Sequence, residues 1–299
     1  MEFTQQERQS WLKFIVLFGF MLLFGVMNVI GGDTDAQFNL DNPDVVTMLK
    51  ILQVVMVILL FILPAVLIAR FWTVQKIPYL GLNKKPAAST LLIGGIGMLM
   101  AMPLINGLSE LNQHMHFPAA FSDIEAWMKN SEDKAAKFTE ALTKGTSVGD
   151  LIFNLFVVAF MAALSEEIFF RGLFQKITIE CFKNKHVGVW IVAIIFSAFH
   201  MQFFGFIPRM IMGAYLGYLF LWTGSLWPGI LAHFLNNGMA VFLMWLVNRG
   251  AVSEDVDKVG SEGGQLIYVI ISAALAIGSL LLIYRTEKKK QNLPNTNLF

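Results

Sequence analysis

The sequence predicts an all-α fold, a polytopic membrane bundle of about eight transmembrane helices. The chain has 299 residues, of which 56% are hydrophobic and 14% are charged, whereas a soluble domain is roughly 45–50% apolar and about 25% charged. Its mean hydropathy is +0.61. The apolar residues are gathered in runs of roughly 20, the length that a helix needs to cross a bilayer. We therefore expect an integral, multi-pass membrane protein.

Eight apolar runs follow one another along the chain. The first is long and lacks the small-residue cleavage site of a signal peptide, so we expect it to span the membrane like the others. The expected spans cover residues 11–30, 47–69, 89–108, 150–171, 187–204, 207–223, 226–248 and 265–284.

One large insertion, residues 109–149, separates the third span from the fourth. Its middle part mixes charged residues with Trp127, Met128, Phe138 and Leu142 at roughly helical spacing. That pattern predicts one or two amphipathic helices that lie on the membrane surface or over the mouth of the bundle. The chain then divides into an N-terminal part with this outward insertion (1–149), a core (150–248), and a last span with a basic tail (249–299).

The connections between the spans differ in charge. Residues 31–43 carry three aspartates and no Lys or Arg, whereas 70–88, 171–186 and the tail from 285 each carry four basic side chains. The positive-inside rule places the basic stretches and both termini in the cytoplasm, and we expect the plasma membrane of a bacterium. The net charge of +1 gives no attraction to nucleic acid, and the single cysteine, Cys181, excludes an intrachain disulfide.

Four ionisable side chains interrupt the later apolar runs: Glu166, Glu167, His200 and His233. A carboxylate at membrane depth costs a few kcal/mol, so it persists mainly where it faces a partner or a water-filled cavity. Taken singly, the glutamates could lie at the headgroup interface, and each histidine could be an interhelical hydrogen-bonding residue. The set as a whole is harder to explain as packing.

Helical spacing sorts these residues. Glu167 and Arg171 are four apart and can form an ion pair, whereas Glu166 lies about 100° round the helix and stays free of that pair. If the fourth helix continues to a turn near Asn184, Glu166 and His200 reach a similar depth. His233 joins them if the extension 172–186 projects about 10 Å beyond the membrane.

Such a set suits hydrolysis of an amide. A glutamate can take a proton from water, a histidine can orient that water or bind a metal, and an asparagine such as Asn237 can stabilise the developing oxyanion. Zinc would also accept His200, His233 and Glu166 and leave a fourth position for water. The H-E-x-x-H spacing of common zinc proteases is absent.

Three motifs resemble one family. EEIFFR (Glu166–Arg171) fits EExxxR, FSAFH (Phe196–His200) fits FxxxH, and HFLNN (His233–Asn237) fits HxxxN. Complete and in this order over about 150–245, they resemble the CPBP family, the CAAX-protease and bacteriocin-processing intramembrane endopeptidases, also called the Abi family.

The resemblance implies a role for each motif residue. Glu166 would activate water with His200 beside it, His233 would complete the site, Asn237 would donate to the oxyanion, and Glu167, Arg171 and Phe196 would support them. The substrate would be a membrane-associated peptide or protein in the lipid bilayer, reached through a cavity open toward the cytoplasm. The resemblance leaves open whether Zn²⁺ takes part.

Two other classes of function stay possible. A catalytically silent membrane regulator, for example an immunity or scaffold protein, could use the same fold to bind a peptide. A transporter could use the carboxylate and the histidines as a proton relay, but the sequence shows no repeated halves of the kind that many transporters have.

Overall fold

The computed structural model describes residues 4–30, 38–72, 77–115, 117–253, 259–261 and 265–291. This part of the chain is helical and contains no strand. The prediction of an all-α membrane bundle is therefore confirmed. Most of the predicted connection at 31–43 and the last eight residues lie outside the described residues.

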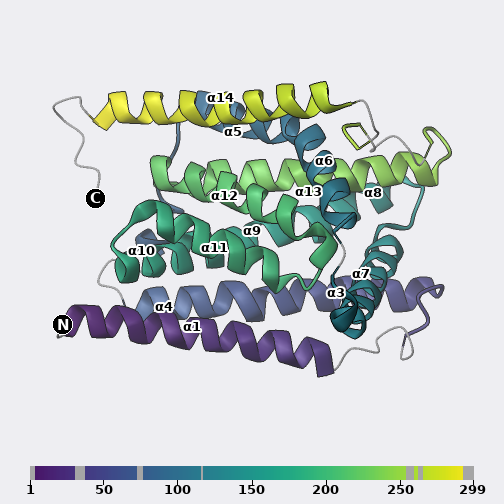
Figure 1. Ribbon diagram of the computed structural model, residues 1–299, viewed down its shortest axis with the longest axis horizontal. Helices are drawn as coiled ribbons and strands as arrows, with labels where there is room; N and C mark the ends of the chain where they lie inside the picture. Colours follow the sequence, from purple (N-terminus) through teal and green to yellow (C-terminus); the bar gives the residue numbers. More distant parts are fainter. Residues whose placement is uncertain are drawn as a thin grey trace.

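The helices lie side by side along the long axis of the molecule (Figure 1). The chain begins with α1 (Gln5–Ile30), α3 (Pro43–Val57), η1 (Ile58–Ile62), α4 (Leu63–Trp72) and η2 (Ile77–Leu80). It continues with α5 (Ala88–Met100), α6 (Met102–Gln113), η3 (Ala119–Phe121), α7 (Ser122–Thr143), α8 (Val148–Asn154), η4 (Leu155–Met161), α9 (Ala162–Glu166), η5 (Glu167–Gln175) and α10 (Lys176–Phe182). The last elements are α11 (Lys185–Phe199), η6 (Phe203–Gly205), α12 (Phe206–Thr223), α13 (Trp227–Asn248) and α14 (Leu266–Gln291).

All eight predicted spans lie on these helices. Within the described residues, six continuous helices are long and apolar enough to cross a membrane, and α11 is a shorter apolar helix. The predicted span at 187–204 was too long, because α11 has 15 residues and ends at Phe199. The N-terminal end of α1 and the C-terminal end of α14 lie at the same end of the bundle (Figure 1), as an even number of spans requires.

The core surrounds the helix that carries the two glutamates. Phe169, Phe170, Leu173 and Phe174 of η5 are fully buried among apolar side chains of α1, α4 and α11. Burial of an aliphatic or aromatic side chain contributes about 1.5–3 kcal/mol, so this cluster fixes η5 in the middle of the bundle. A second cluster joins α5, α12, α13 and α14.

The glutamate helix is one continuous stretch, Val148–Phe182, of 35 residues. It begins with a capping box, in which Ser147 and Asp150 satisfy each other's backbone N–H groups. Two of its segments, η4 and η5, are π-helical, a form that often occurs at functional sites. The stretch ends at Lys183 in the left-handed conformation, after which Asn184 caps α11, so the predicted extension and turn are confirmed.

Helix α7 lies over one end of the bundle (Figure 1). Its Trp127 ring is 5.3 Å from the Phe203 ring of η6, and the Thr143 carbonyl accepts a hydrogen bond from Asn248 at the end of α13 (3.2 Å). The predicted insertion therefore forms an amphipathic helix over the mouth of the bundle. We call this end the α7 end, and the opposite end, which holds Lys84 and the last turn of α14, the basic end.

Candidate active site

Three elements bring Glu166, His200 and His233 together. Glu166 ends α9, His200 follows the last turn of α11, and His233 lies in the second turn of α13. The Oε2 atom of Glu166 lies 3.9 Å from Nε2 of His200 and 3.9 Å from Nε2 of His233. Both imidazoles thus face one carboxylate oxygen.

The other ring nitrogen of each histidine is already occupied. Nδ1 of His200 lies 2.8 Å from the carbonyl oxygen of Phe196, and Nδ1 of His233 lies 3.0 Å from Oε1 of Glu167. A carbonyl and a carboxylate only accept hydrogen bonds, so each Nδ1 carries the proton. In the neutral rings, both Nε2 atoms therefore present a lone pair toward Glu166.

The carboxylates of Glu166 and Glu167 differ in exposure. Its side chain is 15% exposed and that of His200 is 27% exposed, whereas those of Glu167 and His233 are 0% and 2% exposed. Among the described residues, Oε2 of Glu166 is buried and has no hydrogen-bond partner. The carboxylate oxygen and the two imidazole nitrogens are all hydrogen-bond acceptors, so they need a hydrogen-bond donor between them. A water molecule between them could donate two hydrogen bonds.

Glu167 links His233 to Arg171. Its Oε1 accepts a hydrogen bond from Nη1 of Arg171 at 2.7 Å, as their spacing predicts, and a second one from His233. Nη2 of Arg171 donates to the carbonyl of Gly213 (3.0 Å). The guanidinium thus neutralises the carboxylate, and the carboxylate fixes the tautomer and orientation of His233.

Phe196 is the platform on which these groups pack. Its ring is fully buried and lies 4.4 Å from the guanidinium carbon of Arg171. The centroids of the His200 and His233 rings lie 4.9 and 6.0 Å from its own. One aromatic ring therefore contacts the cation and both histidines, which explains why an aromatic residue suits the first position of FxxxH.

Two glycines allow the close approach of helices around Glu167. A Cβ at Gly229, one turn before His233, would lie 2.9 Å from Oε2 of Glu167. A Cβ at Gly213 would lie 3.2 Å from the Phe196 ring. The small residue at 229 therefore lets the buried carboxylate reach α13.

Asn237 lies one turn beyond His233 on α13. Its Oδ1 accepts a hydrogen bond from the side chain of the adjacent Asn236 (3.2 Å), which leaves its NH₂ group as a donor. Within the described residues, the Asn237 side chain forms no hydrogen bond with Glu166 or with either histidine.

The loop that carries His200 is fixed by side chains from other elements. Met201 has a positive φ of 55°, an unusual conformation for a residue with a side chain. Asn112 of α6 donates to the Phe203 carbonyl (3.0 Å) and accepts from the Ile207 N–H (2.9 Å). These contacts satisfy irregular backbone inside the bundle, which is the condition for such backbone at membrane depth.

Two charged residues complete that support. Glu132 of α7 accepts a hydrogen bond from the backbone N–H of Phe204 (3.3 Å). Arg209 of α12 donates to the side chain of Gln202 (2.5 Å) and to its carbonyl (3.3 Å). Neither residue belongs to a motif, and sequence reasoning missed both, together with Asn112 and Gly229.

The predicted zinc ligands are His200, His233 and Glu166, and their spacing can be compared with that of a zinc site. Within the described residues, no three His, Cys, Asp or Glu side chains gather closely enough to hold a metal ion. Tetrahedral zinc with ligand bonds of about 2.0–2.1 Å keeps its ligand atoms about 3.3 Å apart, whereas the two N···O distances here are 3.9 Å. This spacing is wider than tetrahedral zinc requires, and by itself it does not separate a bridging water from a metal.

Comparison with known proteins supports the resemblance over the same segment. Residues 148–239 match the family model for type II CAAX prenyl endopeptidases, described as Rce1-like. That range contains all three motifs, so the resemblance to CAAX proteases is confirmed for this part of the chain.

One curated relative is the uncharacterized protein YpbD of Bacillus subtilis (strain 168), which is 31% identical over 93 residues. The alignment covers 30% of this chain and 42% of YpbD, so it spans less than half of that protein. No solved structure matches the chain.

Proposed function

We propose that this protein is an intramembrane endopeptidase that hydrolyses a peptide bond in a membrane-associated protein or peptide. The observation that carries the proposal is the buried, unsatisfied Oε2 of Glu166, 3.9 Å from two imidazole nitrogens whose lone pairs face it. The family match supports the same class of reaction.

A water molecule held between these three acceptors is ready for attack. Its two hydrogens can bond to two of the acceptors, which directs an oxygen lone pair away from them and toward a substrate carbonyl. Glu166 takes one proton as the carbon–oxygen bond forms. The proton then passes to the amine nitrogen as the carbon–nitrogen bond breaks, which gives a carboxylic acid and an amine.

The remaining motif residues assist these two steps. The NH₂ group of Asn237 is the donor for the oxyanion of the tetrahedral intermediate. His200 and His233 orient the water, and Glu167 and Arg171 position His233 through the contacts described above. A negative charge on Glu166 is stabilised by the buried guanidinium of Arg171.

The proposal takes the route without metal, because no group of three His, Cys, Asp or Glu side chains in the described part of the chain is placed to hold a metal ion. Zn²⁺ held by His200, His233 and Glu166 is the alternative. Elemental analysis of purified protein, together with activity measured before and after chelation, separates the two. Stoichiometric zinc whose removal abolishes turnover would favour the metal.

The direct test is cleavage of quenched fluorescent peptides by purified protein in detergent. We expect turnover by the wild type, none by Glu166→Gln, and a large loss in His200→Ala. Glu287→Gln, the same change at the basic end of α14, is the matched control and should keep full turnover. Equal activity in all four proteins would refute the assignment and favour a catalytically silent regulator.

A further inference from the structure

A cavity of about 820 Å³ lies between α6, α7 and α13, at the α7 end of the bundle. Six residues of α13 line it: Asn236, Ala240, Leu243, Met244, Val247 and Asn248. Their spacing places them along one face of α13 over 12 residues, or about 18 Å at 1.5 Å per residue. The cavity is therefore elongated along the helix.

This cavity begins where the candidate active site ends. Asn236 lines it and bonds to the side chain of Asn237. His233, Asn237, Ala240 and Met244 follow one another at intervals of three or four residues and so lie on one face of α13. The cavity thus lies directly beyond the site along α13, toward the α7 end.

The dimensions and lining suit an extended peptide. An extended chain rises about 3.3 Å per residue, so the lining face of α13, about 18 Å long, accommodates roughly five residues. Leu243, Met244 and Val247 of α13 and Ile105 of α6 offer apolar contacts, and Asn106 of α6 offers polar ones. Clefts of about 300–1,000 Å³ with mixed lining of this kind are typical of ligand sites.

Helix α7 forms the charged wall of the cavity. It contributes Asp133, Lys137 and Glu140, which lie on one face of the helix because they are four and three residues apart. Two carboxylates and one ammonium give this wall a net charge of −1. A basic side chain in the cavity is therefore favoured over an acidic one.

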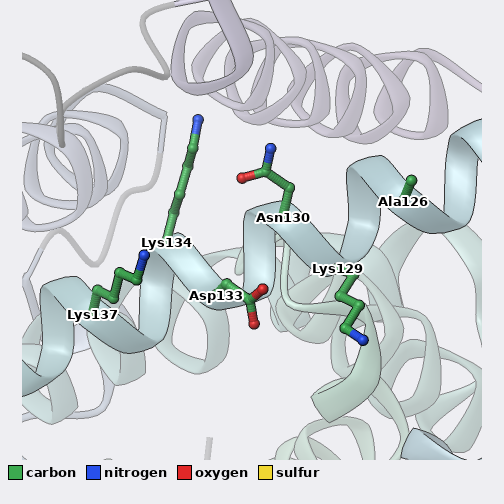
Figure 2. Close-up of a pocket in the computed structure, with 6 residues that line it drawn as sticks. All are labelled: Ala126, Lys129, Asn130, Asp133, Lys134 and Lys137. Atoms are coloured by element: carbon green, nitrogen blue, oxygen red, sulfur yellow. The ribbon is translucent and has the colours of Figure 1, made fainter.

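Helix α7 also lines a second hollow. Figure 2 shows Asn130 and Lys134 projecting from one side of the helix and Lys129 from another. These residues belong to a smaller hollow of about 370 Å³ that α7 lines by itself, and Asp133 and Lys137 line both this hollow and the cavity. Because that hollow has no contact with α13, it does not lead to the site.

We propose that the cavity between α6, α7 and α13 binds about five residues of the substrate in extended conformation beside the scissile bond. The α7 wall selects there for a basic over an acidic side chain. The inference rests on the proposed function, since it assigns the substrate-binding part of that same site.

Photocrosslinking tests binding without turnover. The probe is a mixture of biotinylated peptides with randomised central positions, and the protein is the Glu166→Gln variant with benzoylphenylalanine at Met244. We expect peptide capture at Met244 that unlabelled peptide displaces. The same photoreactive group at Ile277, exposed on α14, is the control and should capture none. Equal capture at both positions, or capture of detergent and lipid only, overturns the proposal.

A cavity-filling variant tests the same site by activity. In Ala240→Trp the indole ring occupies the cavity and blocks the peptide. We therefore expect at least a tenfold loss of kcat/KM with unchanged thermal stability. Ala274→Trp, at an exposed position of α14, is the matched control and should lose nothing. Wild-type turnover that Ala240→Trp leaves intact overturns the cavity assignment and leaves the proposed function standing. Absence of wild-type turnover of any peptide counts against the proposed function, and the crosslinking then decides the cavity.

The charge preference is measured with peptides that differ at one position near the scissile bond. We expect the wild type to prefer Lys over Glu by roughly 2- to 5-fold, the range for a partly solvated charge pair. Asp133→Lys should remove or reverse that preference. An unchanged preference in this variant would refute the role of the α7 wall.

Discussion

Replacing Arg171 by methionine should destabilise the protein strongly. The guanidinium is fully buried; it donates to Glu167 at 2.7 Å and to the Gly213 carbonyl at 3.0 Å, and it packs on Phe196. Methionine fills a similar volume but leaves the Glu167 carboxylate buried without its counter-charge. Breaking such a pair from one side costs about 3–5 kcal/mol.

The expected change can be expressed as a melting temperature. At about 2–4 °C per kcal/mol for a chain of this size, Arg171→Met should lower Tm by about 6–20 °C. The assay heats purified protein in detergent and measures the fraction that stays monodisperse on size-exclusion chromatography. Arg171→Lys keeps the charge, but an ammonium cannot reproduce the planar fork that reaches Glu167 and the Gly213 carbonyl together, so its Tm should lie between those of the wild type and Arg171→Met.

A double variant separates charge from packing. Glu167→Gln in the Arg171→Met background removes the stranded carboxylate, so the double variant should be more stable than Arg171→Met alone. The reasoning is refuted if Arg171→Met melts within about 2 °C of the wild type. It is also refuted if the double variant loses as much Tm as the two single variants together.

Three further predictions concern the supports of the site. Gly229→Ala places a Cβ 2.9 Å from the Glu167 carboxylate; it should abolish most turnover at a cost of about 1–3 kcal/mol in stability, whereas Gly238→Ala, whose nearest new contact is 3.4 Å, should keep activity. Asn112→Ala removes two hydrogen bonds from the loop beside His200, so kcat should fall more than Tm; a normal kcat would show that this loop needs no anchor. Burial raises the pKa of Glu132 above its ordinary value of 4.5, so the ionised carboxylate costs stability at high pH and nothing at low pH. Glu132→Gln keeps the acceptor for the loop N–H and should therefore raise Tm at pH 8 and leave it unchanged at pH 4, as a thermal-shift series across pH would show.

Local patterns predict the helices and the pairs within one helix. Apolar runs locate each span because in a helix a single segment satisfies all of its own backbone hydrogen bonds in a bilayer. The Glu167–Arg171 pair follows from a spacing of four residues. The sequence also placed Glu166 outside that pair, and the structure shows its carboxylate facing both histidines.

Contacts between distant elements could not be predicted in this way. Nothing near Glu132 or Asn112 indicates that their side chains satisfy the loop after α11, because those contacts span 72 and 91 residues of sequence. The contact between Glu167 and His233 depends on how η5 and α13 pack. The end of α11 was placed too late for the same reason, since the apolar pattern continues through Phe203 and Phe204.

The short helix α11 has a consequence for the surrounding lipid. Its 15 residues rise about 22 Å, some 8 Å less than a hydrocarbon core of about 30 Å. A helix shorter than the bilayer is accommodated by local thinning of the membrane or by polar groups that bring water below the headgroups. His200 directly follows the last turn of α11, so an adjustment at that end would bring water close to His200. We therefore expect the length of the surrounding acyl chains to affect how well the site at the end of this one helix is hydrated.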